Sequence, residues 1–428
     1  MNFIIKDIKQ IKKISVIDKI TLVIYSLIPC FLITGTGVSE VGIIVLSLRF
    51  VVEFLFFKKI QIYNKELFYF LFLLYLALII NLYFSVNPEN SFLRNIFFIK
   101  YIIFITGTIN FFSKRNVELF LIIKIWTIIL LIFSIDLFIQ FFTQKNIIGL
   151  ESPLKYHRLS GFMGDELKAG SLILSFCFII SGYFIKNDKY KQKGLILLFL
   201  FVITIFLTGD RSNFLKSIIV TSFLIFFIDR KLIKKTISLF LIVIGFTLVI
   251  ISTNHVFKER FKNQMLNKVI KNKFNLNEFI KETEYGKIYN SAYQLFLEKK
   301  LFGVGNKNYR ILCDEDYKNK FLLKNEIKNP KCNTHPHQIY YEILSEHGIF
   351  GLSFLIVGLL GFIYKNLIFI HKKKDFLLTS LFFSILIIFI PILPGGSFFT
   401  SFNANIFCLN LGFFYSYKNL CSQNKINN

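Results

Sequence analysis

The chain alternates between long runs of apolar residues and short polar segments over most of its length. Most runs are close to the roughly 20 residues that a helix needs to cross a hydrocarbon core about 30 Å thick. The pattern predicts an all-α polytopic membrane protein with about 12 transmembrane helices, whereas a β-barrel would show shorter segments of alternating polarity. The twelve predicted spans are residues 20–36, 38–57, 67–84, 95–112, 117–142, 167–185, 194–208, 214–229, 236–252, 349–368, 376–393 and 402–417.

One polar segment is much longer than the others and divides the chain unevenly. Residues 1–252 would hold transmembrane helices 1–9, residues 253–349 a loop that contains helices, and residues 350–428 helices 10–12 and a tail. No internal repeat is evident. Many transporters are built from repeated halves with the substrate site near mid-membrane, so this layout is not typical of a lipid or glycan transporter, which is the rival class.

Composition and charge support the membrane assignment and give it an orientation. Hydrophobic residues make up 54% of the chain, Phe occurs 55 times, and the mean hydropathy is +0.57. The net charge is +25, and Lys and Arg concentrate in the segments that are cytoplasmic if the N-terminus is cytoplasmic. We therefore expect both termini in the cytoplasm and the long loop on the outer side. No nucleic-acid-binding motif accompanies the charge, so no nucleic-acid partner is expected.

Two helices are predicted within the long loop. Residues 255–274 place five large apolar residues at helical spacing: Phe257, Phe261, Met265, Val269 and Phe274. Because lysines surround them, the pattern is typical of a helix on the bilayer surface, and a helix packed on the rest of the loop is the alternative. Residues 287–300 predict a second helix, which ends before Gly303.

Two of the six cysteines, Cys313 and Cys332, fall in the same outer loop. A disulfide is permitted outside the cytoplasm. It would close a loop of about 20 residues and stabilise the fold by roughly 3 kcal/mol. The bridge would also fix the approach to His335 and His337. Two free thiols are the alternative.

The segment Thr334–Gly348 concentrates three of the six histidines in a polar stretch. Pro336 suits the first turn of a helix and Gly348 suits its C-terminal end. His337 would then lie in the first turn, where the positive end of the helix dipole disfavours a protonated imidazole and favours a nearby phosphate. His337 is therefore a candidate general base. A capping or buried, hydrogen-bonded histidine is the alternative.

A metal site is the competing interpretation of this segment. The possible ligands are His335, His337, Glu342, Glu346 and His347. The spacings His-Glu-x-x-His and His-x-x-Glu-His are both absent. On one helix, His347 would lie about 15 Å along the axis from His337. We therefore expect no metal and no other cofactor.

Arginines are scarce, with eight against 43 lysines, so their positions are informative. The predicted topology brings Arg158, Arg211 and Arg310 to the outer face. Because a guanidinium binds phosphate bidentately and stays charged, such a group suggests a lipid-linked phosphate or diphosphate. Each one alone could instead contact a lipid head group or cap a loop. Arg49 and Glu53 lie four residues apart within one predicted span and are expected to pair.

These residues together resemble the bacterial O-antigen ligase and O-antigen polymerase superfamily. The resemblance covers about residues 155–355 and the plan of twelve spans. The matching segments are Leu301-Phe-Gly-Val-Gly305, His335-Pro-His-Gln-Ile-Tyr340, Glu346-His-Gly348, Thr208-Gly-Asp-Arg-Ser212, and Arg158 with Ser160-Gly-Phe-Met-Gly-Asp165. Each segment alone is a weak signal, but their combination in this order is fairly specific.

The resemblance implies a metal-independent glycosyltransferase in the bacterial inner membrane, with its active site facing the periplasm. Its donor would be a glycan linked to undecaprenyl diphosphate. In an O-antigen ligase the acceptor is a sugar hydroxyl of the lipid A core, which is the interpretation we favour from the sequence. In an O-antigen polymerase, the alternative, it is another lipid-linked repeat unit.

The resemblance also implies roles for individual residues. His337 matches the position proposed for the base, and Arg211 the position that binds the diphosphate. Arg158 and Arg310 are expected to assist Arg211 on the donor diphosphate. The remaining site residues, in supporting roles, are His335, Gln338 and Tyr341. Asparagine is common in the family where this chain has Gln338, which is a mild departure.

Overall fold

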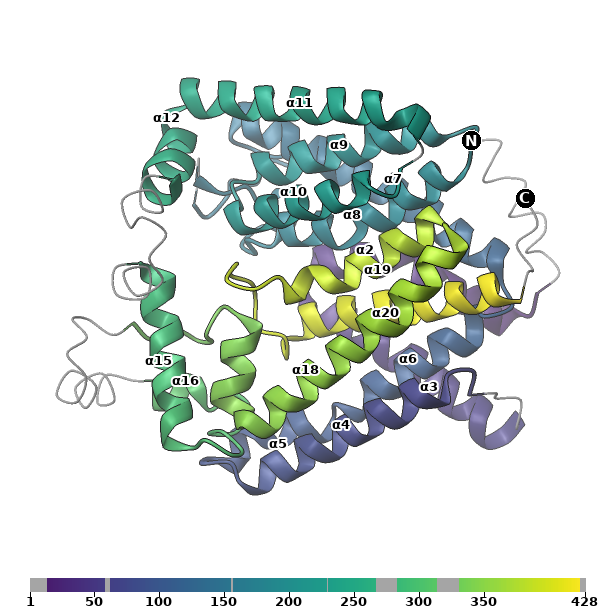
Figure 1. Cartoon of the computed structure of the whole chain (residues 1–428), viewed down its shortest axis with the longest axis vertical. Helices are drawn as coiled ribbons and strands as arrows, with labels where there is room; N and C mark the ends of the chain where they lie inside the picture. Colours follow the sequence, from purple (N-terminus) through teal and green to yellow (C-terminus); the bar gives the residue numbers. More distant parts are fainter. Residues whose placement is uncertain are drawn as a thin grey trace.

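The computed structural model describes residues 14–57, 62–154, 157–228, 230–266, 283–313 and 331–423. Within these ranges every element is a helix, apart from one isolated β-bridge between Lys145 and Glu151. The prediction of an all-α fold is confirmed. Figure 1 shows the helices as a bundle, with α15 and α16 at one end and the C-terminal end of α20 at the other.

Each of the twelve predicted spans falls on a helix or on a pair of consecutive helices. These are α2 (Val16–Thr34), α3 (Thr36–Phe57), α4 (Lys65–Tyr83), α5 (Pro88–Ile96) with α6 (Ile99–Phe112), α7 (Asn116–Thr143), α8 (Ala169–Lys186), α9 (Lys191–Leu207), α10 (Arg211–Ile225), α11 (Arg230–Thr253), α18 (Ile339–Lys373), α19 (Phe376–Leu386) and α20 (Ser401–Ser422). Seven helices in the described ranges are long and apolar enough to cross a membrane: α2, α4, α5 with α6, α7, α8, α11 and α18. The others are shorter or more polar, so the count of twelve stays a prediction.

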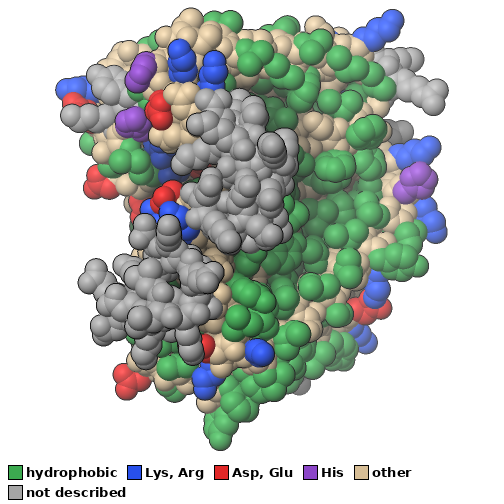
Figure 2. Space-filling view, turned by 60° about the vertical axis from the view of Figure 1, so that its left-hand side comes forward, with side chains coloured by type: hydrophobic (Ala, Val, Ile, Leu, Met, Phe, Trp, Pro, Cys, Tyr) green, Lys and Arg blue, Asp and Glu red, His purple; other side chains and the backbone are tan. Residues whose placement is uncertain are grey.

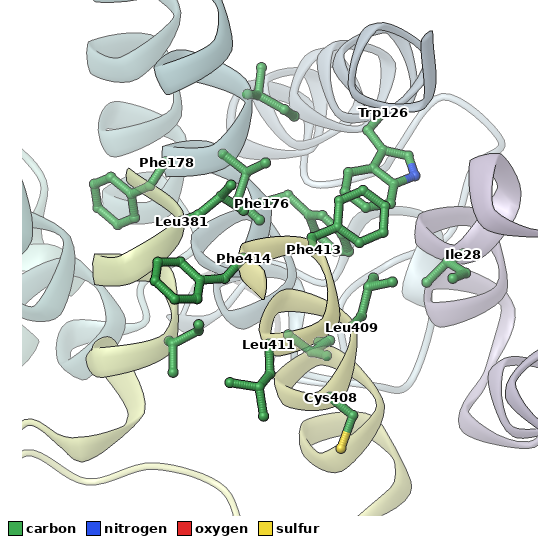
Figure 3. Close-up of a cluster of buried hydrophobic side chains, with 14 of the residues drawn as sticks. Ile28, Trp126, Phe176, Phe178, Leu381, Cys408, Leu409, Leu411, Phe413 and Phe414 are labelled. Carbon is green, nitrogen blue, oxygen red and sulfur yellow. The ribbon is translucent and has the colours of Figure 1, made fainter. Parts of the chain in front are cut away.

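Aromatic packing fixes the centre of the bundle. The Trp126 ring of α7 lies 4.9 Å from the Phe176 ring of α8 and 4.9 Å from the Phe413 ring of α20, centroid to centroid (Figure 3). The Trp126 indole N–H donates to the Tyr25 carbonyl of α2, 3.0 Å away. Since a buried indole N–H needs a partner, this bond ties α2 to the same core. The core is the rigid frame that carries the loops at the end of the bundle.

Two helices on the side of the bundle are much less enclosed than this core. The α8 span is 72% buried, but the α4 span is 17% buried and the α18 span 11%. Figure 2 shows a broad surface of hydrophobic side chains between edges where charged side chains gather. That distribution suits helices whose outer faces contact lipid.

Charged residues at the ends of the first helices pair with one another. The Arg49 guanidinium lies 2.6 Å from a Glu53 carboxylate oxygen and 2.6 Å from an Asp18 oxygen. Arg115 contacts the other Asp18 oxygen at 2.9 Å. The predicted Arg49–Glu53 pair is confirmed, and Asp18 extends it across α2, α3 and the start of α7.

The helices of the long loop pack on the bundle. After α11, α12 (His255–Phe257) continues into the π-helix η3 (Lys258–Leu266). The buried Phe257 and Phe261 rings lie 5.1 and 5.0 Å from the Phe206 ring of α9. The described part therefore packs on the protein and does not present these rings to the bilayer, while Val269 and Phe274 lie outside the described residues.

The second predicted helix of the loop is α15 (Glu284–Glu298), which begins three residues before the predicted start at residue 287. The Thr283 hydroxyl accepts from the Gly286 N–H at 3.0 Å and caps the helix at this earlier point. A short helix, α16 (Tyr309–Leu312), follows the segment Gly303-Val-Gly305, which we call the glycine motif.

Candidate functional site

The histidine segment enters α18 differently from the prediction. The helix begins at Ile339, not at Pro336, and Gln338 is its N-cap. The Gln338 carbonyl oxygen accepts from the N–H groups of Tyr340 and Tyr341, at 2.7 and 3.2 Å. His337 has a φ of 58°, which a helix does not allow, so the prediction that it lies in the first turn is wrong. Gly348, with a φ of 65°, kinks the helix where its end was expected.

His335 and His337 form a close pair in front of this helix. Their ring centroids are 4.0 Å apart, and both side chains are half-buried. Burial lowers the pKa of His337, and burial together with the neighbouring His337 lowers the pKa of His335 to about 4. A neutral imidazole was expected from the helix dipole, but its cause here is burial. The pair is therefore able to accept a proton at neutral pH.

A loop that the sequence analysis missed holds the pair in place. The predicted span 376–393 is too long: α19 and the 3-10 helix η4 (Ile387–Phe389) end before it, because Pro391 and Pro394 cannot continue a helix. Residues 390–400 instead form a loop whose Gly395 N–H donates to the His337 carbonyl at 2.6 Å. The Ser212 hydroxyl of α10 donates to the Pro394 carbonyl. The loop thus connects α10 with the histidine segment.

Three arginines gather at the start of α10, and we call Arg158, Arg211 and Arg260 the first basic group. Arg158 lies 3.0 Å from an Asp210 carboxylate oxygen. Arg211 donates to the Arg260 carbonyl at 2.9 Å, and Arg260 donates to the Gly209 carbonyl at 2.9 Å. Burial, with the positive charges of Arg211 and Arg158, lowers the pKa of Arg260 to about 10. Because a guanidinium group keeps its charge at neutral pH, three of them together form a site suited to an anion.

Tyr285 of α15 connects this group with the histidines. Its ring centroid lies 5.9 Å from that of His337, in an edge-on arrangement. Its hydroxyl is close enough to Arg211 and Arg260 to influence their pKa values. Neither Arg260 nor Tyr285 was predicted from the sequence as a site residue. The scarcity of arginine in the outer loop could have identified Arg260, but no pattern in the sequence marks Tyr285.

Arg310 does not join the first basic group. The positive charge of Arg310 influences the pKa values of Arg94, Lys307 and His335. We call Arg94, Lys307 and Arg310 the second basic group. The predicted arginines are therefore divided between two places. Tyr285 lies between the first group and His337, and the charge of Arg310 influences the pKa of His335.

The glycine motif fastens the second basic group to the kink of α18. The N–H groups of Val304 and Gly305 donate to the carbonyls of Ser345 and Glu346, both at 2.9 Å. A Cβ at Gly303 would come within 2.4 Å of the Glu346 backbone, so only glycine allows this approach. The motif has a positioning role.

The two acidic residues of α18, Glu342 and Glu346, also position neighbouring segments through hydrogen bonds. Buried Glu346 accepts from the Tyr309 N–H at 3.4 Å. Buried Glu342 accepts from the Ser397 hydroxyl and from the Phe398 N–H, the latter at 2.9 Å, and so holds the loop at residues 390–400. In the described part of the chain, no three His, Cys, Asp or Glu side chains are arranged to hold a metal ion.

The remaining predicted residues are structural neighbours of the site. Cys313 and Cys332 form a disulfide with a Cα–Cα distance of 5.3 Å, which joins the end of α16 to the segment that leads into His335. The Tyr341 ring stacks on the Tyr289 ring of α15 with centroids 4.8 Å apart. Both interactions fix the position of the histidine segment against α15 and α16.

The family model described as O-antigen ligase matches residues 196–356 of the chain. This segment belongs to the O-antigen ligase family. The match runs from α9 to the middle of α18 and includes His335, His337, Arg211, Arg260 and Arg310. It confirms the resemblance to the O-antigen ligase and polymerase superfamily. Arg158 lies before the matched segment. No match was found among curated proteins.

Proposed function

We propose that this O-antigen ligase family protein transfers a glycan from an undecaprenyl-diphosphate-linked donor to a sugar hydroxyl. The observation that carries the proposal is the first basic group beside a neutral histidine pair. Arg158 pairs with the Asp210 carboxylate, and Arg211 and Arg260 donate to the carbonyls of Arg260 and Gly209. Tyr285 connects this group with His337. Arginine is the side chain best suited to the two phosphates of such a donor.

The proposed reaction takes place between His337 and the first basic group. The His337 imidazole accepts the proton of the acceptor hydroxyl as the oxygen bonds to the anomeric carbon of the donor sugar. The bond between that carbon and the diphosphate oxygen breaks, and the lipid diphosphate leaves with the electron pair. Arg211 and Arg260, with Arg158 beside them, stabilise the negative charge that develops on the diphosphate. The site needs no nucleotide, because the lipid diphosphate is already activated.

The supporting residues act by placing the base. Gln338 caps α18 and Gly395 holds the His337 carbonyl, so the backbone of His337 is fixed on both sides. The His335 ring lies tilted against that of His337, with the centroids 4.0 Å apart, and limits the positions that the His337 ring can take. We infer that the site faces the periplasm from the bacterial inner membrane, since the long loop is on the predicted outer side.

The acceptor determines whether the protein is a ligase or a polymerase. From the sequence we favour a ligase that acts on the lipid A core. A polymerase that joins lipid-linked repeat units is the second candidate, and one structural observation favours it: a long apolar groove between α4 and α18 that is lined at one end by Asn81 and His347.

Reconstitution of the purified chain tests the proposed function. Proteoliposomes would receive a polyprenyl-diphosphate-linked glycan and, in separate reactions, lipid A core or a second portion of the lipid-linked glycan. We expect glycan transfer with release of polyprenyl diphosphate, abolished by His337→Ala and unchanged by His371→Ala at the other end of α18. Transfer that persists with His337→Ala in a folded protein would contradict the general-base role. Absence of transfer from the wild-type chain with every acceptor would contradict the proposed function.

A further inference from the structure

An apolar groove of about 870 Å³ runs along the side of the bundle between α4 and α18, with side chains of α20 at its base. Its walls reach from Asn81 to Lys65 along α4, a rise of about 24 Å at 1.5 Å per residue. Val357 of α18 lines the groove and is 67% exposed, so the groove opens to the side of the bundle. An opening on the side of a membrane-spanning bundle faces the hydrocarbon core, so a hydrocarbon chain can enter it and water cannot.

A buried polar atom without a partner lies at the outer end of the groove. His347 lines the groove, its side chain is 4% exposed, and its Nε2 has no hydrogen-bond partner in the described part of the chain. Buried polar atoms are usually paired, and because His347 lines the groove, this nitrogen can bind a hydrogen-bonding group of a ligand there. Phe399, whose ring centroid lies 5.0 Å from that of His347, continues the apolar wall beside it.

The second basic group lies at the same end. Arg94 precedes Asn95, whose side-chain N–H lies 3.4 Å from the amide oxygen of Asn81 in the groove wall. Arg310 follows Tyr309, whose N–H donates to the carboxylate of Glu346, the residue before His347. Among the described residues, neither Arg94 nor Arg310 has an ion-pair partner within 4 Å. The neighbouring carboxylate of Glu346 accepts from a backbone N–H instead. Positive charge at the mouth of an apolar groove matches a lipid with an anionic head group.

The position of the groove distinguishes the two substrates of the proposed function. In the donor, the diphosphate is bonded to the reacting carbon and must lie beside His337, where the first basic group is. In a lipid-linked acceptor, the reacting hydroxyl is separated from the lipid phosphate by the sugars between them. His347 lies about 12 Å further along α18 than its first residue, Ile339. The mouth of the groove therefore suits the head group of the acceptor.

The length of the groove identifies the kind of chain. One leaflet of a bilayer offers about half of a 30 Å hydrocarbon core, or about 15 Å. The acyl chains of lipid A end within one leaflet and are several side by side, whereas a polyprenyl chain is single and much longer. A groove about 24 Å long fits the second kind of chain.

We propose that the groove between α4 and α18 binds the polyprenyl chain of a lipid-linked acceptor, with its phosphate held by Arg94, Arg310 and His347. This inference rests on the proposed glycosyl transfer and specifies its acceptor as a second polyprenyl-linked glycan. The two basic groups then hold two lipid carriers on either side of one histidine pair.

A photoreactive polyprenyl monophosphate with a diazirine in its chain tests binding without catalysis. With the full chain in nanodiscs, we expect labelled peptides from α4 and from the second half of α18. Gly361 lines the groove and a Cβ there meets no atom within 4 Å, so Gly361→Phe introduces a large side chain at an open position of the groove wall. It should reduce labelling and raise the acceptor KM by about tenfold. Gly245→Phe, on an equally open face of α11, should change neither.

The head group is tested with an uncharged probe. Arg94→Gln should weaken labelling by the monophosphate severalfold and leave labelling by the matching polyprenol unchanged. Equal effects of Gly361→Phe and Gly245→Phe, or competition by lipid A that exceeds competition by polyprenyl phosphate, would overturn the proposal. A rise in the donor KM alone with Gly361→Phe would overturn the assignment to the acceptor. Transfer that still depends on His337 would leave the proposed function intact in each case.

Discussion

The two basic groups of this protein have similar composition but opposite surroundings. In the first, Arg158, Arg211 and Arg260 are tied to a carboxylate and to backbone carbonyls, and lie beside the neutral histidines. In the second, Arg94 and Arg310 have no ion-pair partner among the described residues, and their chain neighbours Asn95 and Tyr309 contact the end of an apolar groove where His347 lies. Fixed guanidinium groups suit charge that develops during a reaction, because they need no reorganisation. Unpaired ones suit a charged group that arrives and leaves with its substrate.

The difference suggests how one site handles two similar lipid substrates. A reacting diphosphate needs fixed positions within contact of the base, and the hydrogen bonds of the first group provide them. An acceptor phosphate needs affinity only, since its bond to the sugar is not broken. Changes in the first group should therefore lower kcat, and changes in the second should raise KM.

Removal of the base, which lies beside the first basic group, should reduce the rate of glycan transfer more than any other change. His337→Ala is expected to reduce transfer by at least about 10²-fold, the scale of general-base removal. Transfer is measured from purified lipid-linked donor, with folding checked by the thermal unfolding midpoint. The control is His371→Ala, which lies at the other end of α18. If His335→Ala and not His337→Ala abolished transfer, the assignment of the base within the pair would be wrong.

Loss of the guanidinium fork should be the next largest effect. Arg211→Lys keeps the charge but not the paired N–H groups, and we expect kcat to fall by about 10²-fold. Arg115→Lys, near Asp18 at the other end of the bundle, should leave kcat unchanged. Equal kcat values for Arg211→Lys and wild type would remove the first basic group from the chemistry.

Opening the disulfide should affect the site moderately. Cys332→Ser removes a cross-link that stabilises by roughly 3 kcal/mol in the chain-entropy account. Hydrogen exchange of residues 331–338 and of α16 should become faster, and transfer should fall severalfold. Cys30→Ser, a free thiol in α2, is the control. Unchanged exchange in these segments would show that the loop is held by other contacts.

The pH dependence should show the smallest effect. A protonated imidazole cannot accept a proton, so the rate falls as the pH drops through the pKa of His337. Because burial lowers that pKa, the fall should occur below pH 6.5, and the rate at pH 6.5 should stay close to that at pH 7.5. A rate already halved at pH 6.5 would mean that His337 has an ordinary pKa.

The fold was largely predictable because apolar runs leave few choices in a membrane. Each predicted span falls on helical structure, and α15 and the Arg49–Glu53 pair also follow from spacing. The predicted span 376–393 extends beyond the helix. Ile390 and Ile392 are as apolar as residues of a transmembrane helix, but Pro391 cannot continue the helix. Such apolar loop residues carry no local sign that they cover a site.

The candidate site was predictable in its residue types but not in its geometry. Histidine and arginine at the outer face indicated phosphate chemistry. The left-handed conformation of His337 depends on the Gly395 N–H, which is 58 residues away in the sequence, and on the cap at Gln338. The division of the arginines into two groups depends on the backbone hydrogen bond from the Val304 N–H to the Ser345 carbonyl, which holds the glycine motif against α18. These are tertiary contacts, and periodicity cannot reveal them.

The most direct test of the central claim compares one arginine from each group in a single kinetic experiment. Arg260→Lys and Arg310→Gln would be assayed in proteoliposomes with the donor varied at fixed acceptor, and then with the acceptor varied at fixed donor. The account predicts that Arg260→Lys lowers kcat at saturating concentrations of both substrates, whereas Arg310→Gln raises only the acceptor KM. Equal losses of kcat in the two variants, or a raised donor KM with Arg310→Gln, would contradict the separation of the two basic groups.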